Sequence, residues 1–421
     1  MKDTGEKILL KNTSMLYLMT IAKYVFPLLL FPYLTRVLTP GYYGIITYMT
    51  SITSYLSILI DFGFNFSATR KIAQRKNDAD FITKIYASVI QGKVMLALLG
   101  GVVVLVVMPF ISILRENATL LTLYYLSTFL LAFLPDFVYR GMEQMQGITL
   151  RYVISKAITT ALTLLIVKGP QDILWIPVLN AAGNLVALLF AWMNIKKVYR
   201  VMYKPVPLKQ SLAEIKESTV FFISTFASTA FTAANTLFMG FVNMSEAQIA
   251  YWGVAFQLIS VVMSLYEPIT SSIYPRMVIS KSINIVKKIL CIIQPLIVCG
   301  LIFCYFAAPL LIRIVAGAGY EDAIPIFRYM LPVLFFSFPA QILGFPVLGA
   351  LKKENLATRA TVVAAFFHIA GLFLLVATGK FSLLAIALLR SCTELLFMLV
   401  RICYTWGNRA LLQSRSKGES L

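Results

Sequence analysis

Charge is scarce in this sequence, and the residues that build most catalytic and metal sites are scarcer still. Only 13% of the 421 residues are charged, and His368 is the single histidine. Because it lies alone in an apolar run, neither a histidine-based catalytic triad nor a histidine-rich metal site can be assembled. The glycine-rich phosphate loop of nucleotide hydrolases is also missing. We therefore expect no enzyme activity, no catalytic residues, no metal and no cofactor.

Cysteine usage gives no sign of a disulfide framework or of a metal site. All five cysteines lie in apolar stretches of the second half, and none belongs to a CxxC pair: Cys291, Cys299, Cys304, Cys392 and Cys403. We interpret them as small buried hydrophobic residues in helix packing.

Hydrophobic residues, by contrast, make up 59% of the chain, and the mean hydropathy is +0.82. A soluble domain of this composition would aggregate, whereas a bilayer would solvate it. Unbroken apolar runs such as 94–110 exclude a β-barrel. The sequence predicts an all-α integral membrane protein with about twelve spans, the first retained rather than cleaved as a signal. The expected spans are 14–35, 42–61, 84–108, 119–139, 152–168, 173–194, 218–242, 248–269, 288–312, 324–348, 360–378 and 381–401.

The loops between these spans alternate in basic content. One set carries most of the lysines and arginines, and the alternate set carries only five: Arg36, Arg115, Lys168, Arg313 and Lys380. Because basic loops stay on the cytoplasmic side, this alternation predicts an even number of spans and cytoplasmic N- and C-termini. It also accounts for the net charge of +19 without nucleic acid, because these loops would lie beside anionic lipid headgroups.

The longest polar stretch, 195–218, divides the spans into two groups of six. We expect an N-terminal six-helix lobe over 1–200 and a basic cytoplasmic linker over 201–217. A C-terminal six-helix lobe over 218–404 and a cytoplasmic tail over 405–421 follow. Lobes with even span numbers would lie parallel, as in several transporter folds. The external loops are all short.

Ionisable residues inside spans mark the candidate functional positions, because such groups are costly in lipid. The basic ones would form a cationic lining for an anionic substrate: Lys23, Lys93, Arg328 and Arg390. The acidic ones are candidates for ion coupling or gating: Asp61, Asp136, Glu267 and Glu394. Snorkelling or structural ion pairs would explain them as well, and Arg390 and Glu394 stand one helical turn apart, as does Arg140 from Asp136.

Prolines inside spans are the candidate hinges. Each interior proline removes one backbone hydrogen bond and bends the helix. The first span holds Pro27 and Pro32, and the tenth holds Pro332 and Pro339 among prolines that recur every seven residues. A hinged helix in each lobe fits a protein that opens alternately to the two sides of a membrane; a static kink is the alternative.

Three motifs near the start resemble a known family. They are Phe31-Pro32-Tyr33-Leu34-Thr35-Arg36-Val37-Leu38, Gly41-Tyr42-Tyr43-Gly44, and Asp61-Phe62-Gly63-Phe64-Asn65 with Ala68-Thr69-Arg70. They resemble the polysaccharide transporter family of the multidrug/oligosaccharidyl-lipid/polysaccharide (MOP) superfamily, with Wzx-type O-antigen flippases the best match. Chain length, span number and the basic loop after the sixth span extend the likeness over the chain.

The resemblance implies a flippase of the bacterial inner membrane. Family members move undecaprenyl-diphosphate-linked oligosaccharide from the cytoplasmic to the periplasmic leaflet by alternating access of two lobes. Besides this substrate and membrane lipid, it implies H⁺ or Na⁺ as counter-ion and other polysaccharide assembly proteins as partners.

Three alternatives stay open. A MATE-type drug exporter shares the superfamily fold but would favour acidic groups in its cavity. A lipid II flippase typically has two further helices. A membrane O-antigen polymerase or glycosyltransferase has similar hydropathy but usually needs a large periplasmic loop.

Overall fold

Long helices make up almost all of the described structure, which confirms the predicted all-α class. The structure is a computed structural model that describes the backbone of residues 2–412 and their side chains, except those of 2–10 and 230–232. No β-strand occurs within 2–412. The chain forms two compact units, Met1–Phe226 and Ala227–Leu421, here called unit 1 and unit 2.

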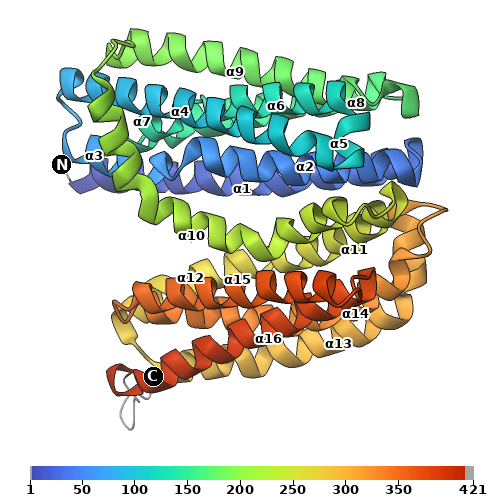
Figure 1. Ribbon diagram of the computed structural model, residues 1–421. Coiled ribbons are helices and arrows are strands. Elements are labelled where there is room, and N and C mark those ends of the chain that lie inside the picture. Colours follow the sequence, from blue (N-terminus) through green and yellow to red (C-terminus); the bar gives the residue numbers. More distant parts are fainter. Residues whose placement is uncertain (1, 413–421) are drawn as a thin grey trace. The chain divides into compact units, whose positions relative to one another are not determined.

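The helices are shown in Figure 1. Unit 1 contains α1 (Lys2–Val37), α2 (Pro40–Asp61), α3 (Phe64–Gln74), α4 (Ala79–Val107), η1 (Met108–Phe110), α5 (Ser112–Glu116), α6 (Ala118–Ala132), α7 (Asp136–Gly141), α8 (Met145–Ile166), η2 (Pro170–Asp172) and α9 (Trp175–Tyr199). Helix α10 (Leu208–Phe241) runs from unit 1 into unit 2. Unit 2 continues with α11 (Glu246–Ser264), α12 (Tyr266–Ser280), α13 (Ile283–Ala316), α14 (Ala323–Ile342), η3 (Leu343–Gly349), α15 (Glu354–Ala377), α16 (Leu383–Gly407) and η4 (Arg409–Leu411).

The number of membrane-spanning helices agrees with the prediction. Among the described residues, eleven helical stretches are long and apolar enough to cross a membrane. A twelfth is added when the two segments of α10, Leu208–Thr229 and Ala233–Phe241, count as one span. The cytoplasmic placement of the two ends stays a prediction.

The two compact units divide between Phe226 and Ala227, inside α10. The lobe boundaries expected from the polar stretch 195–218 stay a prediction, and part of the expected tail, residues 413–421, lies outside the described residues. The N-terminal half of α10 packs with the helices that precede it in the sequence. Sequence polarity could not indicate this, because it marks a loop and not the unit on which the next helix packs.

Unit 1 is built from pairs of neighbouring helices. Helix α1 packs against α8, α2 against α6, α6 against α9, and the short helices α3 and α7 against each other. Phe64 at the start of α3 and Phe137 at the start of α7 are both fully buried. Because each lies in the first turn of a helix that follows a break in a span, part of the core of unit 1 lies beside those breaks.

Helix α14 is the centre of unit 2. It packs against α11, α13 and α16. In the span Ala323–Gly349, which α14 forms together with η3, 72% of the apolar stretch that could cross a membrane is buried. Helix α13 is the opposite case, because no residue in its apolar stretch, the part that could cross a membrane, is buried. Figure 1 shows α13 alongside α14.

The cysteines differ from the expectation that they are buried. Cys304 is partly exposed, and the other four are exposed free thiols. An apolar side chain on the outside of a membrane helix needs no protein contact, because lipid chains surround it. The apolar surroundings of these cysteines in the sequence were therefore wrongly interpreted as burial.

Candidate functional site

A cavity of about 250 Å³ lies inside unit 1, where two spans are interrupted. The second span breaks between α2 and α3, and the fourth breaks between α6 and α7. The cavity is lined by Ser57, Ile58, Asp61, Gly63, Asn65, Phe66, Leu131, Ala132, Leu134, Asp136 and Thr225. Two of the carboxylates predicted from the sequence, Asp61 and Asp136, therefore share one cavity.

The break after α2 depends on a local backbone turn. Phe62 and Gly63 both have positive φ angles, 44° and 81°, which end α2 and restart the chain as α3. A Cβ atom on Gly63 would lie 2.5 Å from the Cβ of Phe221 in α10. Glycine is needed here for both the conformation and the close approach of α10.

The charges at this cavity are arranged with acids at its surface and cations behind them. Lys93 Nζ lies 3.3 Å from Asp61 Oδ1, and Asn65 donates a 2.8 Å hydrogen bond to the same oxygen. Arg151 pairs with Asp136 at 2.5 Å. The acidic side chains are 27% and 23% exposed, whereas those of Lys93 and Arg151 are 1% and 5% exposed.

Lys93 is held by three kinds of contact. Besides its pairing with Asp61, Nζ donates a 2.6 Å hydrogen bond to the carbonyl of Ala132 and lies 5.6 Å from the centre of the Phe137 ring. Ala132 is the last residue of α6, and the last carbonyls of a helix lack helical donors. Lys93 therefore satisfies a broken helix and a carboxylate together, and the structure does not place it at the surface of the cavity.

A row of ion pairs joins α3 to the start of α10, still within unit 1. Lys71 Nζ lies 2.9 Å from Glu214 and 2.6 Å from Glu217, and Arg70 lies 2.9 Å from Glu217. A 2.6 Å hydrogen bond joins Ser67 to Ser218. Sequence reasoning missed this row; the signal that could have found it is a pair of acids three residues apart in an otherwise basic stretch.

Arg390 and Glu394, both on α16 in unit 2, form the pair that their one-turn spacing predicts. They lie 2.5 Å apart with side chains 1% and 3% exposed. A second group of buried polar residues lies next to Arg390, around Thr393 of α16. The ring of His368 on α15 forms a 2.7 Å hydrogen bond with Thr393 and a 2.9 Å hydrogen bond with Asn235 of α10. The single histidine is thus a buried structural residue that joins three helices.

The one-turn spacing of Asp136 and Arg140 suggested a similar pair in unit 1. The structure instead pairs Asp136 with Arg151 of α8. Local spacing could not identify this partner, because Arg151 lies fifteen residues along the chain.

The remaining predicted charges lie on α1, α12 and α14. Lys23 is an exposed residue of α1, and Glu267 is an exposed residue in the first turn of α12. Arg328 of α14 is partly exposed and donates from Nε to the carbonyl of Tyr305, at 3.0 Å. Whether the four cations line one path, and whether the four acids couple ions, stay predictions.

The candidate hinge prolines lie within helices that continue past them. Helix α1 runs through Pro27 and Pro32, and α14 runs through Pro332 and Pro339. The tenth span leaves helical geometry farther along, at Gly344 in η3, where φ is −70° and ψ is −119°. The assignment of the four prolines as hinges stays a prediction.

The break at Gly344 is filled by a charged side chain from the end of the last expected span, which the sequence did not single out as a candidate. Arg401 of α16 donates a 2.5 Å hydrogen bond to the carbonyl of Ala340, and its guanidinium lies 3.9 Å from the centre of the Phe397 ring. A Cβ atom on Gly344 would lie 2.4 Å from an Arg401 nitrogen. Glycine at 344 therefore admits the arginine.

Comparison with known proteins gives one family match. Residues 9–282 match the model of the family described as "Polysaccharide biosynthesis protein". A protein of Escherichia coli (strain K12) named as an O-antigen transporter is 24% identical over 97% of this chain and 100% of its own length. A protein of Shigella dysenteriae with the same name is 26% identical over 87% of this chain and 92% of its own.

Solved structures share the fold. The lipid II flippase MurJ in an inward closed conformation aligns with a TM-score of 0.71 at 15% identity, over 93% of this chain and 87% of that one. An inward-facing multidrug resistance MATE family transporter of the MOP superfamily aligns with a TM-score of 0.64 at 13% identity, over 95% and 96%. At such identities the likeness concerns the fold alone.

Proposed function

Because the chain belongs to the polysaccharide biosynthesis protein family, we propose that it is a Wzx-type flippase of the bacterial inner membrane. Its substrate is an undecaprenyl-diphosphate-linked oligosaccharide repeat unit of O-antigen or a related surface polysaccharide. It moves this unit from the cytoplasmic to the periplasmic leaflet. The observation that carries the proposal is the alignment with a protein named as an O-antigen transporter over 97% of this chain.

The substrate is anionic, so its path needs cations. We assign this role first to Lys23, whose side chain is exposed on α1. Lys93 is buried behind the carboxylate of Asp61, Arg390 is buried together with Glu394, and Arg328 lies at a groove inside unit 2. Alternating access would have to change the surroundings of the buried cations before they could meet a diphosphate.

We assign ion coupling to the cavity of unit 1. Asp61 and Asp136 are the partly exposed members of their ion pairs and therefore the ones that a proton or Na⁺ can reach. A cation on Asp61 would weaken its attraction for Lys93, which loosens the contact between α2 and α4. This gives an ion gradient a physical connection to helix movement.

The proposal is tested in a strain that lacks the protein. We expect lipid-linked repeat units to accumulate on the cytoplasmic leaflet, and the wild-type gene to restore surface polysaccharide. The Lys23→Gln and Asp61→Asn variants should insert normally but restore little. The control variant is Asp78→Asn, which alters only the N-cap of α4.

Two outcomes would contradict the proposal. Single unpolymerised units on the periplasmic side would indicate the polymerase alternative. Unchanged polysaccharide together with loss of resistance to cationic drugs would indicate a MATE-type exporter.

A further inference from the structure

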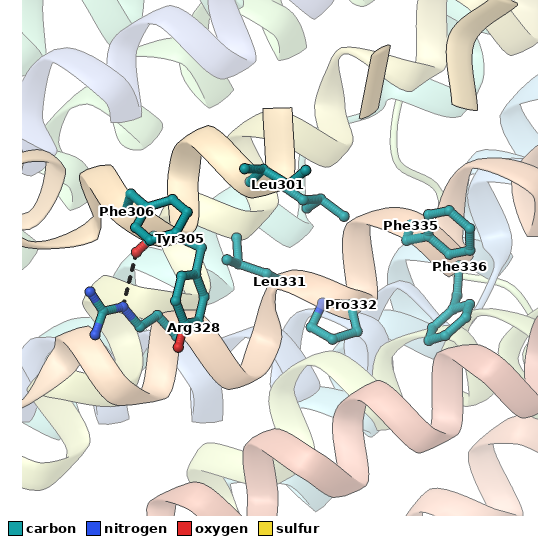
Figure 2. A pocket seen from close by; sticks show the side chains of 9 residues that line it. Leu301, Tyr305, Phe306, Arg328, Leu331, Pro332, Phe335 and Phe336 are labelled. Atoms are coloured by element: carbon teal, nitrogen blue, oxygen red, sulfur yellow. Dashed lines mark hydrogen bonds between the residues drawn. The ribbon is translucent and has the colours of Figure 1, made fainter. Parts of the chain in front are cut away.

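An apolar groove of about 470 Å³ runs between α13 and α14 in unit 2 (Figure 2). Arg328 and Tyr305 lie at one end, and Phe335 and Phe336 lie at the other. The full lining is Leu301, Ile302, Tyr305, Phe306, Arg328, Leu331, Pro332, Phe335 and Phe336. Arg328 is the only charged residue in it, which gives the groove one cationic end and a long apolar floor.

Two prolines explain how the helices on either side of the groove are joined. Pro309 has no N–H for the carbonyl of Tyr305 four residues earlier, and Arg328 Nε donates to that carbonyl at 3.0 Å. Pro339 likewise leaves the carbonyl of Phe335 without a helical donor, and Gln294 donates to it at 2.8 Å. Each helix thus supplies a side chain to a proline-freed carbonyl of the other, near the two ends of the groove.

The bond to Tyr305 uses only part of the Arg328 guanidinium. The Tyr305 ring centre lies 4.7 Å from its central carbon, so the ring covers one face. The two terminal nitrogens make no hydrogen bond or ion pair with the described residues. Oriented by its Nε bond and by the ring, this fork has the geometry that binds phosphate oxygens in pairs.

We propose that this groove binds an anionic phospholipid of the bilayer, with the phosphate on the terminal nitrogens of Arg328 and one acyl chain along the apolar floor. The site lies within unit 2 and is separate from the cavity of unit 1. The lipid would hold α13 against α14 in addition to the two proline-related bonds. With Arg328 occupied by a lipid phosphate, the proposed transport path would draw on the other predicted cations.

The length of the groove favours a phospholipid over the longer lipid-linked substrate. Arg328 and Phe336 are eight residues apart on α14, which corresponds to roughly 12 Å of helix. One leaflet is half of a hydrocarbon core of about 30 Å, so the groove fits the chain of a single-leaflet lipid. With the predicted orientation of the loops, α14 begins on the periplasmic side, and the lipid belongs to the outer leaflet.

Access to the groove is from the side, directly from surrounding lipid. Ile302, Tyr305 and Phe306 on α13 are 55%, 48% and 75% exposed. No residue is buried in the apolar stretch of α13 that could cross a membrane. A phospholipid would therefore enter without any movement of the helices, whereas a substrate in transit needs a path that opens to both sides.

The test uses the purified full chain in nanodiscs and native mass spectrometry, with phosphatidylglycerol as the probe and phosphatidylcholine as the neutral comparison. We expect retained phosphatidylglycerol to fall roughly tenfold in Arg328→Gln, because one charge-assisted interaction is lost. It should also fall in Leu301→Trp, which fills the groove. The matched controls are Arg313→Gln and Leu310→Trp, both exposed positions of α13 outside the groove.

Equal losses in Arg313→Gln and Arg328→Gln would overturn the proposal, since they would indicate unspecific attraction of anionic lipid. A different result would assign Arg328 to the substrate instead. In that case purified Arg328→Gln retains phosphatidylglycerol, but the same variant fails to restore surface polysaccharide in the strain that lacks the protein. Surface polysaccharide is measured separately, so failure of the lipid site leaves the flippase proposal standing, and the reverse also holds.

Discussion

Unit 1 and unit 2 both contain backbone carbonyls that lack a helical hydrogen-bond donor, and the two units supply the missing donors differently. Backbone carbonyls in a bilayer need donors, and both units contain interrupted or proline-containing spans. In unit 1 the donor is Lys93, which bonds the end of α6 and is neutralised by Asp61. In unit 2 the carbonyls of Tyr305 and Ala340 receive arginine side chains, and that of Phe335 receives Gln294.

The difference concerns the accompanying charge. The donor of unit 1 has a carboxylate partner that is 27% exposed and lines a cavity. Arg328 of unit 2 lies instead at an apolar groove. We infer that an intramembrane cation is first a donor for open backbone, and that its neighbours decide whether it can also respond to an ion or a lipid. The strength of this comparison can be tested by substitution.

The largest effect is expected at Lys93. Changing Lys93→Met removes the donor of Ala132 and leaves Asp61 without its cation, which should destabilise unit 1 by about 3 kcal/mol. Equilibrium unfolding in mixed micelles measures the loss. Adding Asp61→Asn should recover part of the stability, because the unpaired carboxylate is gone. A double variant as unstable as the sum of the two single variants would show that the pair is not coupled.

A smaller effect is expected at Gly344. The methyl group of Gly344→Ala would displace the Arg401 guanidinium from the Ala340 carbonyl, and the lost bond should reduce stability by about 2 kcal/mol. Gly300→Ala is the matched control, because nothing lies within 4 Å of its added Cβ and it sits inside α13. The control should gain up to ~1 kcal/mol from helix propensity. Equal stability of the two variants would contradict a role for Arg401 at the break.

The smallest effect is expected from Pro309→Ala combined with Arg328→Gln. Alanine restores an N–H for the Tyr305 carbonyl, so loss of the arginine should matter less in this background, by about 1 kcal/mol. A double-mutant cycle in the same micelles measures the coupling. Additive effects would mean that Arg328 is not the substitute donor for the proline-freed carbonyl.

Much of the fold was predictable because each span carries its own signal. A twenty-residue apolar run satisfies its own backbone by forming a helix, so composition within a window is enough to locate it. Eleven of the expected spans therefore correspond to helical stretches among the described residues that could cross a membrane, and the seventh, 218–242, corresponds to the bent helix α10. The pair of Arg390 with Glu394 was predictable for the same reason, because four residues are one turn of a single helix.

The candidate site was less predictable, because its partners are far apart in the sequence. Asp61 and Lys93 belong to different helices, and Asp136 pairs with Arg151 and not with Arg140, its neighbour one turn away. Arg401 was not singled out as a candidate, because it stands at the very end of the last expected span, 381–401. The ion pairs of Lys71 with Glu214 and Glu217 cross more than a hundred residues.

By itself, the sequence determined that the surroundings of this protein are a lipid bilayer, about how many spans it has, and which residues carry a charge that must be explained. These follow from local composition, because hydropathy and helical spacing act over one or two turns. The tertiary structure decided which partner each charge meets: Lys93 the end of α6, Arg328 a carbonyl freed by Pro309, and Arg401 the space at Gly344. These contacts depend on how helices that are distant in the sequence pack together, and no single stretch of the chain encodes that packing.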